Sequence, residues 1–279
     1  MDCSHLYIFE FSKRDNKVVA HAADGKGLVG GRFELDYPSV GATETLMMAA
    51  CMAQGNTLLS NVAQEPEIID LACFLTKTRA HIEGAGTDTI RIHGKSRLLG
   101  TEYRIMPDRI ETGTFMIAAA ITRSCISMSP VFPGCLSSLI DKLSMGEELA
   151  GFVIKTLPYP GFPTDLQPQT MALLSTCNGL SIVEESVFEN RMTHVRGLQK
   201  LGAKIQVCEN TAFVSGKENG NKLRGTRVVA SDLRGGMSLV LAGLAAEGVT
   251  EVNGISHIDR GYETLEKKLQ LLGAHVIRL

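Results

Sequence analysis

Three stretches of this chain repeat one order of residue types, and this repeat constrains the fold more than any other feature. Each stretch has an apolar segment rich in small residues, then a glycine, a short alternating segment and a polar loop. Helices and strands differ in their apolar period, so each stretch predicts a helix, a stop, a strand and a second helix. The stretches are residues 46–70, 171–195 and 239–263.

A weaker fourth copy, residues 115–130, lies between the first two strong copies, with an arginine in place of the glycine. The four stop positions are separated by 68, 56 and 69 residues, so the unit between the second and third stops is short. Its second predicted helix, within residues 136–158, runs into the next unit without a hairpin. This period indicates a repeated α/β module. The stop positions are Gly55, Arg123, Gly179 and Gly248.

After each strong copy, a second helix is followed by alternating residues that predict another strand. Gly202 and Gly273 lie where two of these helices end, as expected for a left-handed backbone. Arg79 takes this place in the first copy, where a left-handed arginine is expected to cost about 1 kcal/mol. Residues 6–35 predict a strand, a turn and a strand without a preceding helix, so we expect the chain to begin within a unit.

Composition excludes several classes of protein. A formal charge of -2 over 279 residues provides no basic surface for nucleic acid or an anionic membrane. No apolar segment is long enough for a membrane span or a signal peptide. The seven cysteines and seven histidines show no spacing typical of a disulfide framework or a metal site, so we predict reduced core thiols and no bound metal.

Polar motifs recur at the starts of the predicted helices, in a fixed order over nearly the whole chain. Such a set is far more specific than any single motif, and by it the sequence resembles the enolpyruvyl transferases, in particular the branch that acts on a UDP-sugar. The motifs are SVGATETLM at 39–47, EPEIID at 65–70, PDRIETGTF at 107–115, FPTDLQ at 162–167, VFENR at 187–191, SDLR at 231–234 and HIDRGYE at 257–263.

The resemblance implies a mixed α/β (α+β) fold, a two-domain inside-out barrel of repeated βαβαββ units with helices inside and sheets facing water. Small residues in segments such as MMAACMA allow helices to approach closely, as this arrangement requires. Residues 1–106 would then be the remnant of an incomplete first domain. Residues 107–279 would be the second domain, with one shortened repeat.

The reaction that the resemblance implies is transfer of the enolpyruvyl group of phosphoenolpyruvate to the 3-hydroxyl of UDP-N-acetylglucosamine, a step toward peptidoglycan precursors of the cell wall. It needs no cofactor. The expected partners are these two small molecules, with neither nucleic acid nor membrane. Association with a missing first-domain half is a further expectation. We expect a cytoplasmic location, or the plastid stroma if an upstream targeting segment was lost.

Ser39, Val40 and Gly41 precede or open a predicted helix, where free backbone N–H groups are available to an anion. From the residues alone, an ordinary serine N-cap is the competing interpretation. The resemblance implies that this segment binds the nucleotide diphosphate. Tyr37 stands where the family usually has lysine, so one cationic phosphate contact is in question.

Asp165 also precedes a predicted helix, and an N-cap carboxylate is again the alternative. The resemblance implies that it faces the sugar 3-hydroxyl as the catalytic base. Arginines are suited to the carboxylate and phosphate of phosphoenolpyruvate, although each is singly more typical of a surface salt bridge. By the resemblance, Arg260 is catalytic and the remaining residues line the substrate site: Glu65, Asp108, Thr164, Val187, Arg191, Asp232 and Arg234. Asp108 and Glu111 are interpreted as organisers of a helix start rather than as bases.

Segments that the family uses for catalysis do not occur in this sequence, namely a GAKNA segment and a loop that carries a cysteine or aspartate. Two hypotheses follow. The chain is part of an active transferase whose missing half comes from elsewhere, or it is a catalytically incomplete descendant that retains part of the sugar-nucleotide surface. The shikimate-pathway enolpyruvyl transferase is a weaker alternative, because it lacks this combination of motifs. We expect no phosphate release from the isolated chain.

Overall fold

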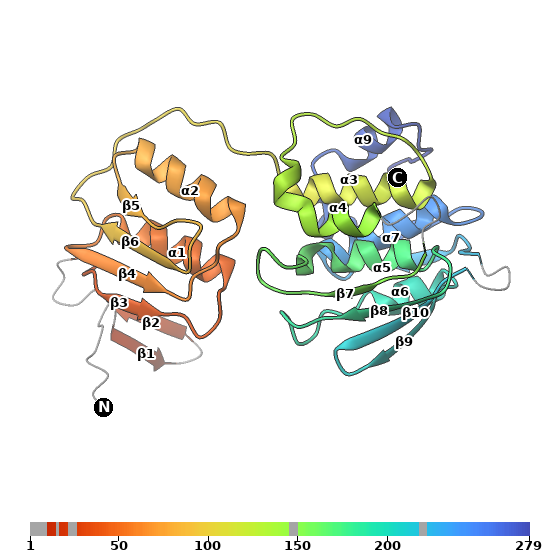
Figure 1. Ribbon diagram of the computed structural model, residues 1–279, viewed down its shortest axis with the longest axis horizontal. Helices are drawn as coiled ribbons and strands as arrows, with labels where there is room; N and C mark the ends of the chain where they lie inside the picture. Colours follow the sequence, from red (N-terminus) through yellow and green to blue (C-terminus); the bar gives the residue numbers. More distant parts are fainter. Residues whose placement is uncertain (1–9, 15–16, 22–26, 145–149, 218–221) are drawn as a thin grey trace. The chain divides into compact units, whose positions relative to one another are not determined.

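The computed structural model describes residues 10–14, 17–21, 27–144, 150–217 and 222–279 (Figure 1). The chain divides into two compact units, Met1–Met106 and Pro107–Leu279, each described here by itself. That residues 1–106 are the remnant of a first family domain stays a prediction. Among the described residues, no helix has both the length and the hydropathy to cross a bilayer.

Unit 1 holds a hairpin and a four-stranded sheet with two helices. In the sheet, with order β3-β4-β6-β5, β3 runs parallel to β4 and the other neighbours are antiparallel. The hairpin joins β1 and β2, and the beginning of the predicted strand-turn-strand segment lies outside the described residues. The elements are β1 (Glu10–Arg14), β2 (Lys17–His21), β3 (Arg32–Glu34), α1 (Val40–Ala50), β4 (Asn56–Ser60), α2 (Pro66–Lys77), β5 (His81–Glu83) and β6 (Thr89–His93).

The core of unit 1 lies between the two helices and one face of this sheet. Met47 of α1 and Ile68 of α2 are fully buried against Leu59 of β4 and Ile90 and Ile92 of β6. Because neighbouring strand residues point to opposite faces, the residues between the buried positions of β6 face outward. The sheet therefore has one apolar face and one solvent-facing polar face.

Unit 2 contains a second four-stranded sheet of order β7-β8-β10-β9 and a parallel pair, β11-β12. The order and strand directions repeat those of unit 1, because β7 is parallel to β8 and the rest are antiparallel. Its elements are α3 (Arg109–Thr122), η2 (Pro133–Leu136), α4 (Ser137–Leu143), β7 (Val153–Lys155), η3 (Thr164–Leu166), α5 (Gln167–Leu174), β8 (Leu180–Glu184), α6 (Val195–Lys200), β9 (Lys204–Cys208), β10 (Thr211–Ser215), β11 (Arg227–Val229), α7 (Leu233–Ala245), β12 (Glu251–Asn253), α8 (Ser256–Asp259) and α9 (Leu265–Leu271).

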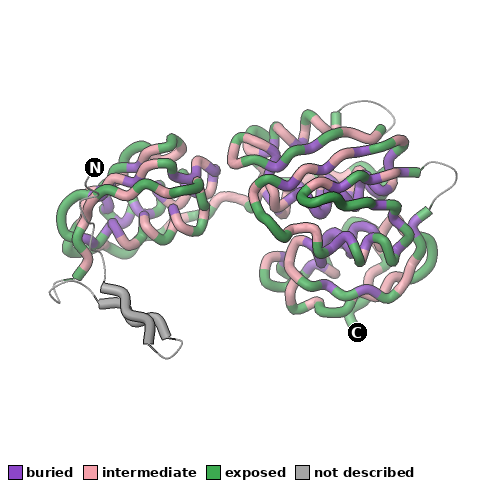
Figure 2. Tube along the Cα trace, turned by 90° about the horizontal axis from the view of Figure 1, so that it is seen from below, coloured by how far each residue is buried: buried purple, intermediate pink, exposed green. Residues whose placement is uncertain are grey.

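Helices α3, α5 and α7, one from each repeat of unit 2, pack against one another at its centre (Figure 1). Every residue of α5 is buried, so this helix has no solvent-facing side. Figure 2 shows the buried segments in purple. Gly113 of α3 permits this packing, because a Cβ there would lie 2.6 Å from the side chain of Leu166. Helices inside and sheets outside are the arrangement that the family resemblance implied.

The left-handed backbone predicted at one set of repeat positions is confirmed, with φ angles of +98° at Gly202, +91° at Gly273 and +79° at Arg79. The stop glycines are left-handed as well, with +83° at Gly55, +84° at Gly179 and +90° at Gly248. Arg123 adopts φ +56° directly at the end of α3. The repeat therefore fixes backbone conformation even where glycine has been replaced.

A further glycine precedes the first strand of each repeat and was not identified from the sequence. A Cβ at Gly30, Gly151 or Gly225 would lie 2.5, 2.6 or 2.4 Å from a backbone oxygen of the neighbouring parallel chain. The backbone N–H groups of these glycines instead donate to the carbonyls of Gln54, Asn178 and Glu247, at N···O distances of 2.8, 2.6 and 2.7 Å. Each of these carbonyls belongs to the residue just before a left-handed stop glycine. The close approach of two chains, rather than a turn, requires glycine at these positions.

Two predicted strands do not form. Residues 124–132, after Arg123, and residues 274–279, after Gly273, have no strand assignment. In the complete repeats, the corresponding strands hydrogen-bond to β6 or to β10. Among the described residues, no equivalent strand pairs with either of these two segments. The sequence predicted that the shortened repeat lacks a hairpin, and the described residues of that repeat form none.

The cysteines are only partly core residues. Cys51 and Cys177, at the ends of α1 and α5, are buried, and burial raises the pKa of each thiol to about 11. The prediction of core thiols is wrong for three exposed cysteines, because they lie on an outward helix face, in a loop and at a strand end. These are Cys73, Cys125 and Cys208.

Replacing Arg79 by glycine should raise the free energy of unfolding by about 1 kcal/mol, because the arginine occupies the left-handed region and its side chain is exposed. Gly202→Ala, at the same repeat position in unit 2, should lower it by a similar amount. Urea unfolding of both variants measures this. Shifts in the same direction would contradict the explanation by backbone strain.

Candidate functional site in unit 2

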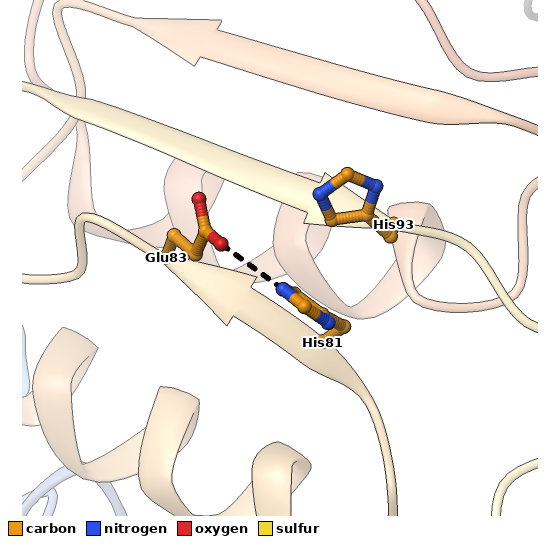
Figure 3. A group of neighbouring side chains, drawn as sticks. All are labelled: His81, Glu83 and His93. Carbon is orange, nitrogen blue, oxygen red and sulfur yellow. Dashed lines mark hydrogen bonds and ion pairs between the residues drawn. The ribbon is translucent and has the colours of Figure 1, made fainter.

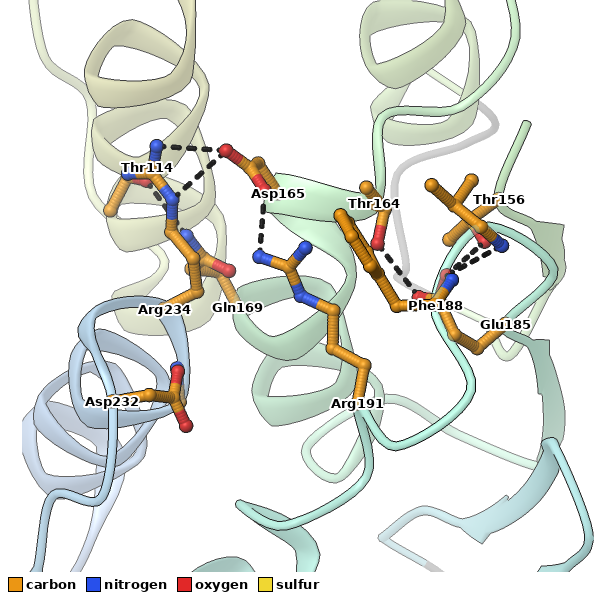
Figure 4. A network of polar contacts seen from close by, with 12 residues as sticks. Thr114, Thr156, Thr164, Asp165, Gln169, Glu185, Phe188, Arg191, Asp232 and Arg234 are labelled. Atoms are coloured by element: carbon orange, nitrogen blue, oxygen red, sulfur yellow. Dashed lines mark hydrogen bonds and ion pairs between the residues drawn. The ribbon is translucent and has the colours of Figure 1, made fainter. Parts of the chain in front are cut away.

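Asp165 lies in η3, immediately before the buried helix α5, and joins two arginines (Figure 4). Its Oδ1 accepts a hydrogen bond from Nη2 of Arg191 at 2.6 Å, and its Oδ2 accepts from Nη2 and Nε of Arg234 at 2.9 and 3.3 Å. Arg191 comes from the segment between β8 and α6, and Arg234 from the first turn of α7. The side chain does not cap α5, so the N-cap alternative for Asp165 is wrong.

The Arg191–Asp165–Arg234 cluster is partly shielded from water. The exposed fractions of the three side chains are 21%, 36% and 14%, in that order. Burial alone would raise the pKa of Asp165, but the charges and hydrogen bonds of Arg234 and Arg191 outweigh it and hold the pKa below its ordinary value. Asp165 is therefore ionised at neutral pH, with both of its oxygens engaged.

A buried tyrosine anchors Arg234 to the central helices. The hydroxyl of Tyr262, which is fully buried, lies 3.2 Å from Nη1 of Arg234, 3.2 Å from Nε2 of Gln169 and 2.9 Å from Oγ1 of Thr114. Arg234 and Gln169 donate to it, so the hydroxyl donates to Thr114, whose own hydroxyl donates to the Ile110 carbonyl. Hydrogen bonds from α3 and α5 thus fix the Tyr262 hydroxyl, which in turn orients Arg234 of α7.

Thr164 and Val187 are organised by Glu185, a residue that the sequence analysis missed. The Glu185 side chain is 2% exposed and follows β8. Its Oε2 accepts from the Thr164 hydroxyl at 2.9 Å, and its Oε1 accepts from the Val187 and Phe188 backbone N–H groups at 3.0 and 3.1 Å. Glu185 therefore fixes the loop that leads to Arg191, and Figure 4 shows the two groups side by side.

Asp232 is the N-cap of α7 and lies beside a buried histidine. Its Oδ1 accepts from the Gly235 backbone N–H at 2.8 Å. Burial would raise the pKa of Asp232, but this bond, the Ser231 hydroxyl and nearby charges lower it. His194 is 3% exposed, and its Nε2 has no hydrogen-bond partner in the part of the chain that the structure describes. Burial lowers the pKa of His194 to about 4, despite the opposite effect of Asp232.

In unit 1, the predicted anion-binding segment opens α1. Ser39 is its N-cap, and its Oγ accepts from the Ala42 backbone N–H at 3.4 Å, so the capping interpretation is confirmed. A Cβ at Gly41 would meet nothing within 4 Å, so packing does not require glycine there. Glu65 is the N-cap residue of α2 and is 7% exposed.

Two further predicted residues lie at helix ends of unit 2. Asp108 is the N-cap of α3, where its Oδ1 accepts from the backbone N–H groups of Ile110 and Glu111 at 2.7 and 3.2 Å. Glu111 forms an ion pair with Lys268 of α9. Arg260 is exposed at the end of α8, and no hydrogen bond or ion pair joins it to the Arg191–Asp165–Arg234 cluster.

The described fold matches one class of protein. A family model for EPSP synthase (3-phosphoshikimate 1-carboxyvinyltransferase) matches the chain twice, at residues 10–152 and 137–269. The enolpyruvyl transferase NikO from Streptomyces tendae is 25% identical, with a TM-score of 0.82 over 96% of this chain and 69% of that one. An EPSP synthase from Acinetobacter baumannii, 18% identical with a TM-score of 0.66, shares the fold over 90% of this chain and 64% of its own.

Curated relatives narrow the comparison. The chain is 52% identical to the UDP-N-acetylglucosamine 1-carboxyvinyltransferase of Gloeobacter violaceus, over 92% of this chain and 59% of that protein. It is 48% identical to the protein of that name from Finegoldia magna, over 97% of this chain and 67% of the relative. The chain belongs to the enolpyruvyl transferase family, whose fold is the two-domain inside-out barrel. It spans less than two thirds of the Gloeobacter relative.

Proposed function

We propose that the chain takes part in transfer of the enolpyruvyl group of phosphoenolpyruvate to the 3-hydroxyl of UDP-N-acetylglucosamine. The names of its relatives support this substrate pair. The observation that carries the proposal is the carboxylate of Asp165 held between two guanidinium groups, because it combines a proton acceptor with two anion-binding forks. A cytoplasmic location is part of the same proposal.

In this proposal, Asp165 removes the proton of the sugar hydroxyl. Arg191, Arg234 and Arg260 bind the carboxylate and phosphate of phosphoenolpyruvate, since a guanidinium presents paired donors to such groups. The start of α1, with Ser39, Val40 and Gly41, binds the diphosphate through backbone N–H groups. The remaining residues line the substrate site or hold its loops: Glu65, Asp108, Thr164, Val187 and Asp232.

The ion pairs also suggest how the base is activated. While both arginines contact Asp165, its pKa is low and it is a weak proton acceptor. An anionic substrate that binds Arg191 and Arg234 competes with Asp165 for their N–H groups. Losing these bonds raises the proton affinity of the carboxylate, because the bound anion also offsets the arginine charges and burial then has the larger effect. Donor binding would thus produce a stronger base beside the acceptor hydroxyl.

The alternative is a catalytically incomplete chain that only binds the sugar nucleotide. Isothermal titration of the 279-residue chain with UDP-N-acetylglucosamine, with shikimate 3-phosphate as the matched control, tests the substrate class. We expect heat from the first ligand alone. Heat from shikimate 3-phosphate alone would reverse the assignment, and heat from neither ligand would contradict it. A phosphate-release assay with phosphoenolpyruvate then separates turnover from binding.

Gly41→Ala should weaken binding of UDP-N-acetylglucosamine about tenfold without loss of stability. The added methyl group meets no protein atom within 4 Å, and alanine is the better helix former, so the free energy of unfolding should rise slightly. A diphosphate that contacts the backbone would be hindered by it. Titration and thermal unfolding give the two values, with Ala42→Ser as a control at the next helix position. Unchanged affinity would exclude α1 as the diphosphate site.

A further inference from the structure

A second cluster of polar side chains lies on the outward face of the sheet in unit 1, away from the helices. His81 and Glu83 are two residues apart on β5, so they point to the same face. His93 on β6 is directly opposite His81 in the strand register. Figure 3 shows the three side chains gathered over strands β5 and β6.

The potential ligand atoms of these three residues are close enough to share one cation. One nitrogen or oxygen from each lies within 4.8 Å of the others. Nε2 of His81 is already 3.0 Å from Oε1 of Glu83, and the imidazole ring centres of His81 and His93 are 4.5 Å apart. Zinc bonds of about 2.1 Å in tetrahedral geometry put neighbouring ligand atoms roughly 3.4 Å apart. Side-chain rotations on the exposed face suffice to close the remaining gap.

Asn56 of β4 supplies the outer contact that a metal-binding histidine requires. It lies directly opposite His93 in the register, and its Oδ1 is 2.7 Å from Nδ1 of His93. Because an amide oxygen only accepts, Nδ1 carries the hydrogen, which leaves the lone pair on Nε2. This second contact fixes the tautomer and orients the ring, as in established metal sites.

We propose that His81, Glu83 and His93 form a binding site for a divalent transition metal of the zinc class. Two imidazoles and one carboxylate suit zinc, and three protein ligands leave one position for water. Nη1 of Arg91 lies 3.9 Å from Oε2 of Glu83, and its positive charge repels a bound cation. We therefore expect micromolar rather than nanomolar affinity. Bound metal would fasten β5, the three-residue edge strand, to β6.

Titration calorimetry with ZnCl₂ on the thiol-reduced full chain, in a buffer that does not chelate metals, tests the site. His81→Ala and His93→Ala should each weaken the micromolar event at least tenfold. All three side chains are at least partly exposed, so these variants should fold, which circular dichroism verifies. His275→Ala removes an exposed histidine elsewhere and Cys73→Ser an exposed thiol, and both should bind as the parent does.

Arg91→Gln provides an independent readout, because loss of the neighbouring positive charge should tighten zinc binding several-fold. Zinc should also raise the unfolding temperature of the parent chain but not that of His93→Ala. The proposal is overturned if zinc binds the parent no better than either histidine variant. It is also overturned if the Cys73→Ser substitution, rather than a histidine substitution, abolishes the event.

Discussion

Acidification from pH 7 to pH 4 is expected to lower the free energy of unfolding by about 3 kcal/mol through His194 alone. Burial lowers the pKa of this imidazole to about 4 in the folded chain, whereas an unfolded histidine has an ordinary value of 6.5. Between these values the unfolded chain binds the extra proton, so stability falls as the pH falls through this window. Below pH 4 both states are protonated and the loss is complete.

The groups around His194 act in opposite directions but do not change the sign. Burial is the largest effect, and the Arg191 charge also lowers the pKa of His194. Asp232 and a hydrogen bond with the Arg191 backbone raise it. Nothing in the described chain accepts a hydrogen from Nε2, so protonation would bury an uncompensated donor as well as a charge. Acid should therefore loosen the segment between Arg191 and α6 first.

Urea unfolding at pH 7, 6, 5 and 4.5, for the parent and for His194→Phe, measures this contribution. The variant has no group that titrates at this position, so the difference in stability between the two chains should change by more than 2 kcal/mol over the range. His275→Ala, at an exposed position, should follow the parent. Carboxyl groups that titrate in both chains cancel in the comparison. Parallel pH profiles for the parent and His194→Phe would show that His194 is not the acid-sensitive group.

Much of the fold could be predicted because local constraints recur. A helix that ends before a strand favours a left-handed residue, so Gly202 and Gly273 were predicted to be left-handed, and the same order of residue types identified Arg79 as their counterpart. The strand order within each sheet was not predictable in this way. It depends on which chains approach closely, a property that Gly225 and its equivalents express through contacts with residues far along the sequence.

The candidate site was predicted residue by residue but not as an arrangement. Asp165, Arg191 and Arg234 were all named, yet the same motifs also suit an N-cap and two surface arginines. Only the packing of α5 and α7 brings them into contact. Glu185 and His194 carried no such pattern, because a lone buried polar residue resembles an exposed one in sequence.

The histidine cluster of unit 1 shows the same limit. His81 and His93 meet through antiparallel register, and Asn56 meets His93 through a third strand. A search for closely spaced ligands on one helix or loop does not find such a site. Predicting it requires the hairpin register, and that in turn requires knowing where β5 ends and β6 begins.

Asp165→Ala is expected to have the largest functional effect. It leaves two guanidinium groups without their shared carboxylate, and breaking a buried pair in this way costs 3–5 kcal/mol. Because Asp165 is 36% exposed, we expect a loss of stability of about 2 kcal/mol. Asp165→Ala combined with Arg234→Met should recover part of this loss, since the second change removes the charge that lost its partner. Urea unfolding of the single and double variants gives the coupling energy.

Measuring the affinity for phosphoenolpyruvate distinguishes whether Asp165 is a catalytic base or only a structural anion. In Asp165→Ala the arginines no longer have an internal competitor, so phosphoenolpyruvate should bind several-fold more tightly despite the lower stability. In any form of the polypeptide that turns over, the same change should reduce kcat by about 10²–10⁴-fold, the usual contribution of a general base. Glu251→Ala, which breaks an exposed ion pair with Arg227 instead, should leave donor binding unchanged. Weaker binding of phosphoenolpyruvate to Asp165→Ala would mean that Asp165 prepares the arginines for the donor, and the competition mechanism would then be wrong.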